Sequence, residues 1–254
     1  MKVVLLGSGN VATHLALALK ANGEDIVQVY SPNLINAKAL AGQIEAAAVN
    51  DLSMVNQQAD LYIISVKDDA IEAVAIGLKG VDGLVVHTSG TTDLKALSAQ
   101  LTKTGVFYPL QTFSKNKAVD FKNVPLCIEA NTQEQLEILK QLAGKLSEKV
   151  YELDGDKRKV LHLAAVFACN FTNHLYTLAN EVLAANHLEF DIIRPLIAET
   201  ADKIKENLPG NVQTGPAVRH DETTIKAHLS RLESMPELHN IYESLSNSIK
   251  LTYK

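Results

Sequence analysis

The first part of the chain alternates short apolar runs with longer stretches in which apolar residues recur at helical spacing. Short runs rich in β-branched residues predict strands, and the stretches between them predict helices. We expect strands at Lys2–Leu6, Asp25–Tyr30, Asp60–Val66, Gly83–Thr88, Gly105–Tyr108, Val124–Glu129 and Lys149–Leu153. We expect helices at Val11–Ala21, Asn36–Gln43, Ala70–Leu78, Asp93–Leu101 and Gln133–Leu146. This alternation predicts an α/β fold with a Rossmann-type doubly wound, mostly parallel sheet.

Strand-like runs end near Asp154, and only helical patterns follow. These patterns cover residues 156–186, 189–206, 221–233 and 236–251, with Gly, Pro and polar residues at the breaks between them. A change of pattern of this kind marks a domain boundary. We therefore predict an α/β domain over residues 1–153 and an all-α domain over residues 154–254.

Charge and cysteine content narrow the class of protein. The 254 residues carry a net charge of −5, and no lysine or arginine run offers a footprint for nucleic acid. No apolar run approaches the ~18 residues that cross a bilayer, and the N-terminal stretch lacks a signal-peptide cleavage region. Cys127 and Cys169 lie far apart, which is typical of reduced thiols. We expect a cytoplasmic protein with no nucleic-acid partner and no membrane partner.

A glycine motif follows the first predicted strand. Gly7-Ser8-Gly9-Asn10-Val11-Ala12 matches G-x-G-x-x-G/A between a strand and a helix, which is the context that gives this motif its meaning. Gly7 permits the tight turn, Gly9 lets the backbone approach a pyrophosphate, and Ala12 allows close packing of helix and strand. The phosphates would lie on the free N–H groups at the helix N-terminus. The motif therefore predicts dinucleotide binding.

Two other interpretations of this motif stay open. A plain strand-to-helix turn has the same residues, and S-adenosylmethionine is another ligand of glycine-rich loops. The second alternative fits less well, because those loops usually carry an acid before the first glycine, where this chain has Leu6.

The end of the second predicted strand bears on the choice of cofactor. An NAD site usually has Asp or Glu there, which holds the ribose 2′-hydroxyl. This chain has Ser31 and Asn33 instead, and no carboxylate that would repel a 2′-phosphate. NADP is therefore the cofactor we expect, although the arginine typical of such sites is replaced at best by Lys38.

Three more strand ends carry polar side chains, at the edge of a doubly wound sheet where ligands bind. They are Ser65-Val66-Lys67, His87-Thr88-Ser89-Gly90 and the stretch from Tyr108 through Gln111 and Thr112 to Phe113. The last opens a long loop, and such loops are often functional. Asp68 and Asp69 fit helix capping equally well, and Thr92, which precedes Asp93, is assigned to helix capping.

The predicted helix at 156–186 carries an unusual polar stripe. If each residue advances about 100° and His162 is set at zero, the other polar residues fall within about 120° of it. They are Lys159, Asn170, Asn173, His174, Thr177, Asn180 and Glu181. A solvent-facing stripe would be rich in Lys and Glu, whereas the centre of this one holds His and Asn. His162 is a candidate general acid or base, or else a core histidine bonded to a backbone carbonyl.

Two other chemistries fit this stripe poorly. The spacing of His162 and His174 matches no known metal site, and we expect no metal. A serine nucleophile would need a G-x-S-x-G elbow, which the chain lacks.

Several stretches together resemble one bacterial family. They are GSGNVA, HTSGTT, GVFYPLQTFSK, HLAAVFACNFTNHLY and QTGPAVRHDE, and they are spread over nearly the whole chain. The family is that of the NADP oxidoreductases with a Rossmann-like N-terminal domain and a C-terminal helical domain of unassigned function. It is similar to pyrroline-5-carboxylate reductase, prephenate dehydrogenase, deazaflavin-dependent NADP reductases and the 6-phosphogluconate dehydrogenase group. The resemblance implies that the helical domain binds substrate and builds a homodimer.

The resemblance also implies site residues. The cofactor would bind to Gly7, Ser8, Gly9, Asn10, Val11, Ser31, Asn33, Ser65, Val66, Lys67, His87, Thr88, Ser89 and Gly90. The substrate would meet Tyr108, Gln111 and Thr112, while Arg219 could hold a substrate carboxylate or phosphate or belong to a capped loop. Relatives often have Lys-x-x-x-Asn on the long helix, but here Lys159 is followed by Leu163 at that spacing. His162, Asn170 and Asn173 occupy the stripe instead.

These observations favour an NADP-dependent oxidoreductase that transfers hydride between nicotinamide and a small-molecule carbonyl, imine or alcohol in a cleft between the domains. His162 would be the acid or base, with Lys159 as the alternative, and Asn170 and Asn173 would orient the substrate. Because Lys-x-x-x-Asn is missing, a non-catalytic NADP-binding sensor or scaffold that dimerises through its helical domain stays open as an alternative.

Overall fold

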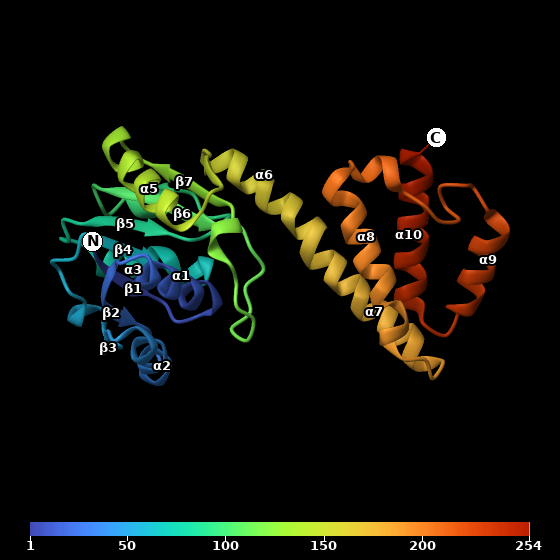
Figure 1. The fold of residues 1–254 in the computed structure, drawn as a ribbon, viewed down its shortest axis with the longest axis horizontal. Coiled ribbons are helices and arrows are strands. Elements are labelled where there is room, and N and C mark those ends of the chain that lie inside the picture. Colours follow the sequence, from blue (N-terminus) through green and yellow to red (C-terminus); the bar gives the residue numbers. More distant parts are fainter. Residues whose placement is uncertain (254) are drawn as a thin grey trace. The chain divides into compact units, whose positions relative to one another are not determined.

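The computed structural model describes residues 1–253 and divides into two compact units. The first unit is Met1–Cys169 and the second begins at Asn170. Figure 1 shows the first in blue to yellow and the second in orange and red. The strands end at Glu152, close to the boundary that we predicted near Asp154. The boundary between the two compact units comes later, after Cys169, because the helix that follows the last strand belongs to the first unit.

One sheet organises the first unit. In the described residues it has eight strands in the order β3-β2-β1-β4-β5-β6-β7-β8. The strands are β1 Lys2–Leu6, β2 Asp25–Tyr30, β3 Ala47–Val49, β4 Leu61–Ile64, β5 Leu84–His87, β6 Thr104–Pro109, β7 Leu126–Ala130 and β8 Val150–Glu152. The pairs from β3 to β6 are parallel, β6 and β7 are antiparallel, and β7 and β8 are again parallel. The predicted Rossmann-type, mostly parallel α/β fold is confirmed.

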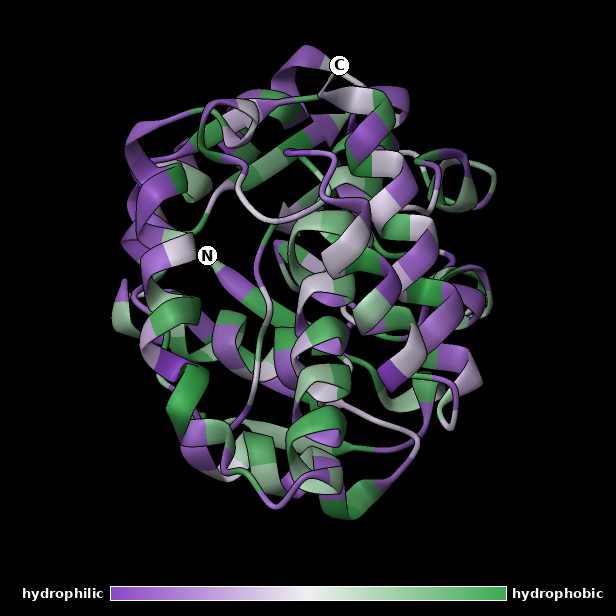
Figure 2. Cartoon of the chain, turned by 90° about the vertical axis from the view of Figure 1, so that its right-hand side faces the viewer, coloured by the Kyte–Doolittle hydropathy of each residue, from purple (hydrophilic) through white to green (hydrophobic). Residues whose placement is uncertain are grey.

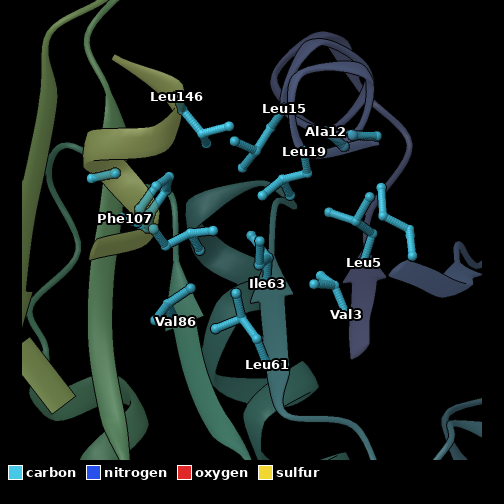
Figure 3. Packing of buried hydrophobic residues seen from close by; sticks show 14 of the residues in the cluster. Val3, Leu5, Ala12, Leu15, Leu19, Leu61, Ile63, Val86, Phe107 and Leu146 are labelled. Atoms are coloured by element: carbon cyan, nitrogen blue, oxygen red, sulfur yellow. The ribbon is translucent and has the colours of Figure 1, made fainter. Parts of the chain in front are cut away.

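Helices cover both faces of this sheet. Those of the first unit are α1 Asn10–Ala21, α2 Leu34–Ile44, α3 Ile71–Gly77, α4 Lys95–Ser98, α5 Gln133–Leu146 and α6 Gly155–Ala165. Short 3₁₀ turns lie at Leu52–Met54, Asp68–Ala70 and Phe121–Asn123. Val3 and Leu5 point to one face, where they pack with α1, α2 and α5, while Val4 and Leu6 point to the other, with α3 and α4. Figure 3 shows the first of these layers, with Leu15 and Leu19 of α1 above Val3, Leu5, Leu61 and Ile63.

The second unit is helical. It contains α7 Thr172–Ala185, α8 Arg194–Glu206, α9 Glu222–Arg231 and α10 Pro236–Thr252, with 3₁₀ turns at Phe190–Ile193 and Pro209–Val212. In Figure 2 green and purple segments alternate along these helices, which is the pattern of amphipathic helices. No residue of α7 or α8 is buried. Within residues 1–253 no helix is long and apolar enough to span a bilayer.

A π-helical segment corrects the predicted stripe. Val166–Phe171 forms a π-helix between α6 and α7, in the middle of the stretch predicted as one regular helix. A π-helix advances less per residue than an α-helix, because its hydrogen bonds run from i to i+5. The regular 100° step, on which the prediction of a single stripe rests, therefore fails between His162 and Asn173.

Candidate functional site

The turn after β1 has the geometry of a phosphate loop. Gly7 has φ +128°, in the region that favours glycine, and its N–H donates to the Tyr30 oxygen at 2.8 Å. A Cβ on Gly7 would lie 2.1 Å from the backbone oxygen of Ser65, so β1 and the end of β4 approach too closely for any side chain. Gly7 therefore has the role in the tight turn that the motif predicts.

The start of α1 suits an anion. Gly9 precedes the helix in an extended conformation, and a Cβ placed on it would meet nothing within 4 Å. Among the described residues no side chain caps this helix, and its first turn holds no acid. The first N–H groups of a helix have no intrahelical partner, so those near Asn10 and Val11 are available to a ligand. The residues present thus fit the pyrophosphate of a dinucleotide.

The end of β2 is lined by hydroxyl and amide groups. The Ser8 hydroxyl donates to the Ser31 hydroxyl at 3.0 Å. Asn33 caps α2, because its side-chain oxygen accepts from the Ile35 and Asn36 N–H groups at 2.9 and 3.4 Å. This capping role uses the oxygen of the Asn33 side chain and not its amide nitrogen. No carboxylate occurs between Ser31 and Lys38.

A hydroxyl network joins the ends of β4 and β5. The Ser65 and Thr88 hydroxyls lie 2.8 Å apart, and the Ser89 hydroxyl accepts from the Thr91 and Thr92 N–H groups at 3.1 and 2.9 Å. The Thr91 hydroxyl donates to the Asp68 carboxylate. Val66 and Lys67 continue from β4 into the 3₁₀ turn, and Val66 packs against the core on the face of the sheet that α3 and α4 cover. The predicted strand-end residues are thus brought to one edge of the sheet.

His87 lies beneath this network and is fully buried. The Ser89 N–H donates to its Nδ1 at 3.2 Å, and its Nε2 has no partner in the described residues. Burial, and secondarily the Arg158 guanidinium, lower the pKa of His87 to about 4. The imidazole is therefore neutral at pH 7 and supports the strand end from inside.

The centre of the site is a pair formed by Tyr108 and His162. The Tyr108 hydroxyl and the His162 Nδ1 lie 3.0 Å apart, joining the end of β6 to α6. A Cβ on Gly90 would lie 2.6 Å from that Nδ1 and 2.8 Å from the Tyr108 ring. Only glycine at position 90 leaves room for the pair. The positions of Tyr108 on β6, Gly90 after β5 and His162 on α6 thus depend on one another.

The surroundings of the pair keep the Tyr108 phenol protonated. Burial, and then the nearby Cys127, raise the pKa of Tyr108 to about 12, and burial raises the pKa of Cys127 to about 11. The phenol therefore keeps its proton at neutral pH and can donate it to His162 Nδ1. A neutral imidazole that accepts at Nδ1 carries its own proton on Nε2.

Two basic residues support the start of α6. Arg158 is 1% exposed, pairs with the Glu129 carboxylate of β7 and donates to the Thr92 oxygen at 2.5 Å. The Lys159 ammonium lies 3.3 Å from the Asp93 carboxylate. Because Arg158 joins α6 to both β7 and the loop after β5, it helps to hold in place the helix that carries His162.

Other predicted residues lie elsewhere. Gln111 and Thr112 are exposed, and the Thr112 N–H donates to the Gln111 side chain at 2.8 Å. Asn170, Asn173 and Arg219 belong to the second unit, where Asn170 is in the π-helix and Arg219 is exposed. Asn173 lines a groove of about 680 Å³ with Thr177, Asn180 and Arg194.

Sequence reasoning missed Arg158, Glu129 and His14. Arg158 lies in the run Asp156-Lys157-Arg158-Lys159, which has the composition of an exposed helix turn. Glu129 is 29 residues away from Arg158, so no local pattern connects them. For His14 a signal existed, since it lies four residues after Asn10 and so on the same face of the helix.

Comparisons with known proteins give matches along most of the chain. Residues 2–89 match the family described as "NADP oxidoreductase coenzyme F420-dependent", and residues 124–249 match a domain of unknown function, DUF2520. Comparison with curated protein sequences gives no match. The second match begins before β7, so it covers β7, α5 and β8 as well as the helices that follow.

Three solved structures extend this comparison. BF3122 of Bacteroides fragilis, to which NADP oxidoreductase activity is ascribed, is 47% identical and has a TM-score of 0.93, over 98% of this chain and 97% of that one. 1-Pyrroline-5-carboxylate reductase from Streptococcus pyogenes is 14% identical, with a TM-score of 0.65 over 98% of each chain. An imine reductase of Streptomyces aurantiacus is 12% identical, with a TM-score of 0.68 over 98% of this chain and 96% of that one. The last two share the fold, and the first confirms the resemblance predicted from the sequence.

Proposed function

Because this chain belongs to the family of NADP oxidoreductases that its Bacteroides fragilis relative represents, we propose that it transfers a hydride between NADP and a small-molecule carbonyl, imine or alcohol. The observation that carries this proposal is the Tyr108–His162 pair at the carboxyl end of the sheet, packed against Gly90. When bound, the nicotinamide supplies the hydride chemistry, and the protein orients and protonates.

His162 is the proposed acid and base. With Nδ1 occupied by the Tyr108 hydroxyl at 3.0 Å, Nε2 is the nitrogen left to meet a substrate. In the reducing direction a protonated His162, whose Nδ1–H faces the Tyr108 oxygen, would give its Nε2 proton to the substrate oxygen or nitrogen as the hydride reaches the adjacent carbon, and would become a neutral imidazole; oxidation reverses both transfers. Lys159 is the alternative acid, but its ammonium is paired with Asp93 at 3.3 Å.

The test compares variants on a substrate found by screening. His162→Ala should lower kcat by about 100-fold, the usual contribution of a positioned acid or base. Tyr108→Phe should lower kcat less and shift its pH profile, because the imidazole loses the partner at Nδ1. The NADPH dissociation constant should stay within about twofold in both. Unchanged turnover in His162→Ala would show that His162 is not the acid or base.

The NADP preference rests on the end of β2. Ser31 and Ser8 offer hydroxyls and Asn33 an amide where an NAD enzyme would have a carboxylate. Ser31→Asp should weaken NADPH binding by about tenfold or more, since a carboxylate repels the 2′-phosphate, and should leave NADH binding nearly unchanged. Equal losses for both cofactors would contradict this assignment.

The rival hypothesis is a sensor or scaffold without catalysis, and the same protein decides between the two. NADPH that binds tightly but is not oxidised by a broad panel of carbonyls, imines and deazaflavins would favour the sensor. Turnover with any of them, lost in His162→Ala, would favour the oxidoreductase.

We also propose that the protein works as a cytoplasmic homodimer. The described part of the second unit exposes the large apolar side chains of Leu175, Val182, Leu188, Ile192, Leu196, Ile204, Leu208 and Leu245. Large exposed apolar patches mark interfaces, and a second copy presents the same patch about a twofold axis. Both cysteines are free thiols, as expected in a reducing compartment.

Sedimentation velocity tests the dimer. We expect a dimer at micromolar concentration and a monomer for Leu196→Glu, which places a charge in the patch. Ile76→Glu is the matched control, because Ile76 is a similarly exposed apolar residue on α3 of the first unit. A monomeric wild-type protein would contradict the proposal.

A further inference from the structure

The face of α1 next to the phosphate loop holds another segment of the chain. The Asn10 side-chain amide donates to the Phe113 oxygen at 3.0 Å. The His14 Nε2 lies 2.8 Å from the Ser114 oxygen and must carry the proton, because a carbonyl can only accept. Asn10 and His14 are one helical turn apart and bind consecutive carbonyls, so they fix the backbone of the loop between β6 and β7 (Figure 1).

A stack of three rings reinforces these hydrogen bonds. The Phe113 ring lies on the His14 ring, with centroids 5.0 Å apart and planes at 26°. The Phe113 ring also stacks on the Phe121 ring, with centroids 6.0 Å apart and planes at 19°. His14 and Phe121 are 7% and 8% exposed. Both ends of the segment between Phe113 and Phe121 are therefore anchored.

The segment itself begins with a closed turn. The Lys117 N–H donates to the Ser114 oxygen at 3.2 Å, the same oxygen that accepts from His14. Lys115 and Asn116 are the central residues of this turn, and both are exposed. Among residues 1–253 no salt bridge involves Lys115 or Lys117, and both residues are exposed.

This arrangement brings the turn that carries Lys115 and Lys117 against α1. Asn10 is the first residue of α1, whose open N-terminus fits a diphosphate, and its side chain is bonded to the loop. A loop that only closed the fold would need neither two helix side chains at the phosphate end nor two lysines at its tip. Opposite charges within a few ångströms stabilise each other, and lysine is a common phosphate ligand.

We propose that the turn Ser114–Lys117 is the outer wall of the cofactor's diphosphate site, where Lys115 and Lys117 bind the phosphates. Asn10 and His14 are positioning residues that hold the turn over the start of α1. The inference rests on the proposed function, because it assigns a further part of the same cofactor site.

Cofactor affinity tests the lysines directly. The double variant Lys115→Ala/Lys117→Ala should raise the NADPH dissociation constant, measured by nucleotide fluorescence, by about tenfold or more. It should also make that constant less dependent on salt, because fewer protein cations meet phosphate. The matched control Lys122→Ala/Lys149→Ala removes two charges from exposed positions outside the turn and should leave the constant within about twofold.

Limited digestion with trypsin tests the positioning residues. Trypsin cleaves after Lys115 and Lys117, and we expect NADPH to slow both cuts in the wild-type protein. His14→Phe keeps the ring stack but loses the Nε2–H donor, so it should be cut faster and be protected less by NADPH. His14→Gln restores a donor amide and should recover much of the protection, which a merely space-filling role of His14 would not predict.

The outcomes separate this inference from the proposed function. If the wild-type protein binds neither NADPH nor NADH, the proposed function fails. If it binds NADPH but the double variant Lys115→Ala/Lys117→Ala changes the dissociation constant by less than about twofold, the proposed role of the turn Ser114–Lys117 is wrong and the proposed function stands. Should His14→Phe fail to fold, the lysine pair alone decides.

Discussion

The two units of this protein bury their apolar side chains to very different extents. In the first unit both faces of the sheet lie under helices, and residues such as Val3, Leu5, Ile63 and Phe107 are completely buried (Figure 3). In the described part of the second unit the buried apolar residues are Ala217, Ile225 and Leu232. Both units are rich in Leu, Ile and Ala. The difference therefore lies in where these residues can pack and not in composition.

The difference shows which unit is self-sufficient. Small domains bury too little surface to be stable unless something else covers their apolar faces. The first unit has two core layers, whereas α7 and α8 have no buried residue at all. We therefore expect the first unit to carry most of the stability of a single chain, and the second to gain its stability on association.

Matched truncations give the largest expected effect. Phe107→Ala should lower the free energy of unfolding by about 3–5 kcal/mol, because Phe107 is fully buried in the first unit. Leu196→Ala in the second unit should change it by about 0.5 kcal/mol or less in dilute protein, because Leu196 is 65% exposed. Urea unfolding measures both, and equal losses would mean that the units do not differ as described.

A buried imidazole should make the first unit sensitive to acid. The pKa of His87 is about 4 in the folded protein and 6.5 ordinarily, so between these values the unfolded state binds more protons. Its contribution to the free energy of unfolding is present above pH 6.5 and is lost as pH falls to about 4, by up to about 3 kcal/mol.

The variant His87→Leu isolates this contribution. Urea unfolding at several pH values should give a wild-type curve that falls more steeply than the variant curve between pH 6.5 and 4. Parallel curves in that window would show that His87 is protonated equally in the folded and unfolded states.

Dilution should affect the second unit more than the first. For a dimer each tenfold dilution weakens association by about 1.4 kcal/mol, so the second unit should unfold at lower temperature in dilute samples. Hydrogen exchange followed by mass spectrometry should show faster exchange in α7 and α8 on dilution and little change in β1. In Leu196→Glu the exchange of α7 should be fast at every concentration; a concentration-independent pattern in the wild-type protein would contradict the comparison.

Two glycine substitutions give the smallest expected effects, with opposite signs. Gly144→Ala in α5 should stabilise the first unit by about 0.5–1 kcal/mol, because the added methyl group meets nothing within 4 Å and alanine favours helix. Gly215→Ala should destabilise the second unit by about 1 kcal/mol or more, because Gly215 has φ +110°. Thermal unfolding should resolve the two signs, and a gain at Gly215 would indicate that this turn can relax.

Much of the fold could be predicted because its signals are local. The strand Lys2–Leu6 and the helix Gln133–Leu146 begin and end where predicted, since apolar periodicity and end residues act within a few positions. The strand β3, Ala47–Val49, was missed, because three small residues give no alternation to detect. The sequence also predicted the glycine turn, whose geometry is set by backbone conformation alone.

The candidate site was less predictable because it depends on distant pairs. Tyr108 and His162 were both selected, but their contact spans 54 residues and no local spacing encodes it. The π-helix at Val166–Phe171 has no sequence signature, and it separates His162 from Asn173, which regular geometry placed together. The contacts of Arg158 with Glu129 and Thr92 could not be predicted, because Arg158 lies in a run of charged residues that resembles a solvent-exposed helix turn.

The tight space at Gly90 limits the order in which this site can change. A methyl group at position 90 and an imidazole at position 162 cannot occupy their present positions together, since Cβ and Nδ1 would be 2.6 Å apart. A lineage that gains a side chain at position 90 must therefore first lose or move His162, and must also shift the Tyr108 ring, which would lie 2.8 Å from the new Cβ. Substitutions at the two positions should be strongly non-additive, and across related sequences glycine at 90 should accompany histidine at 162.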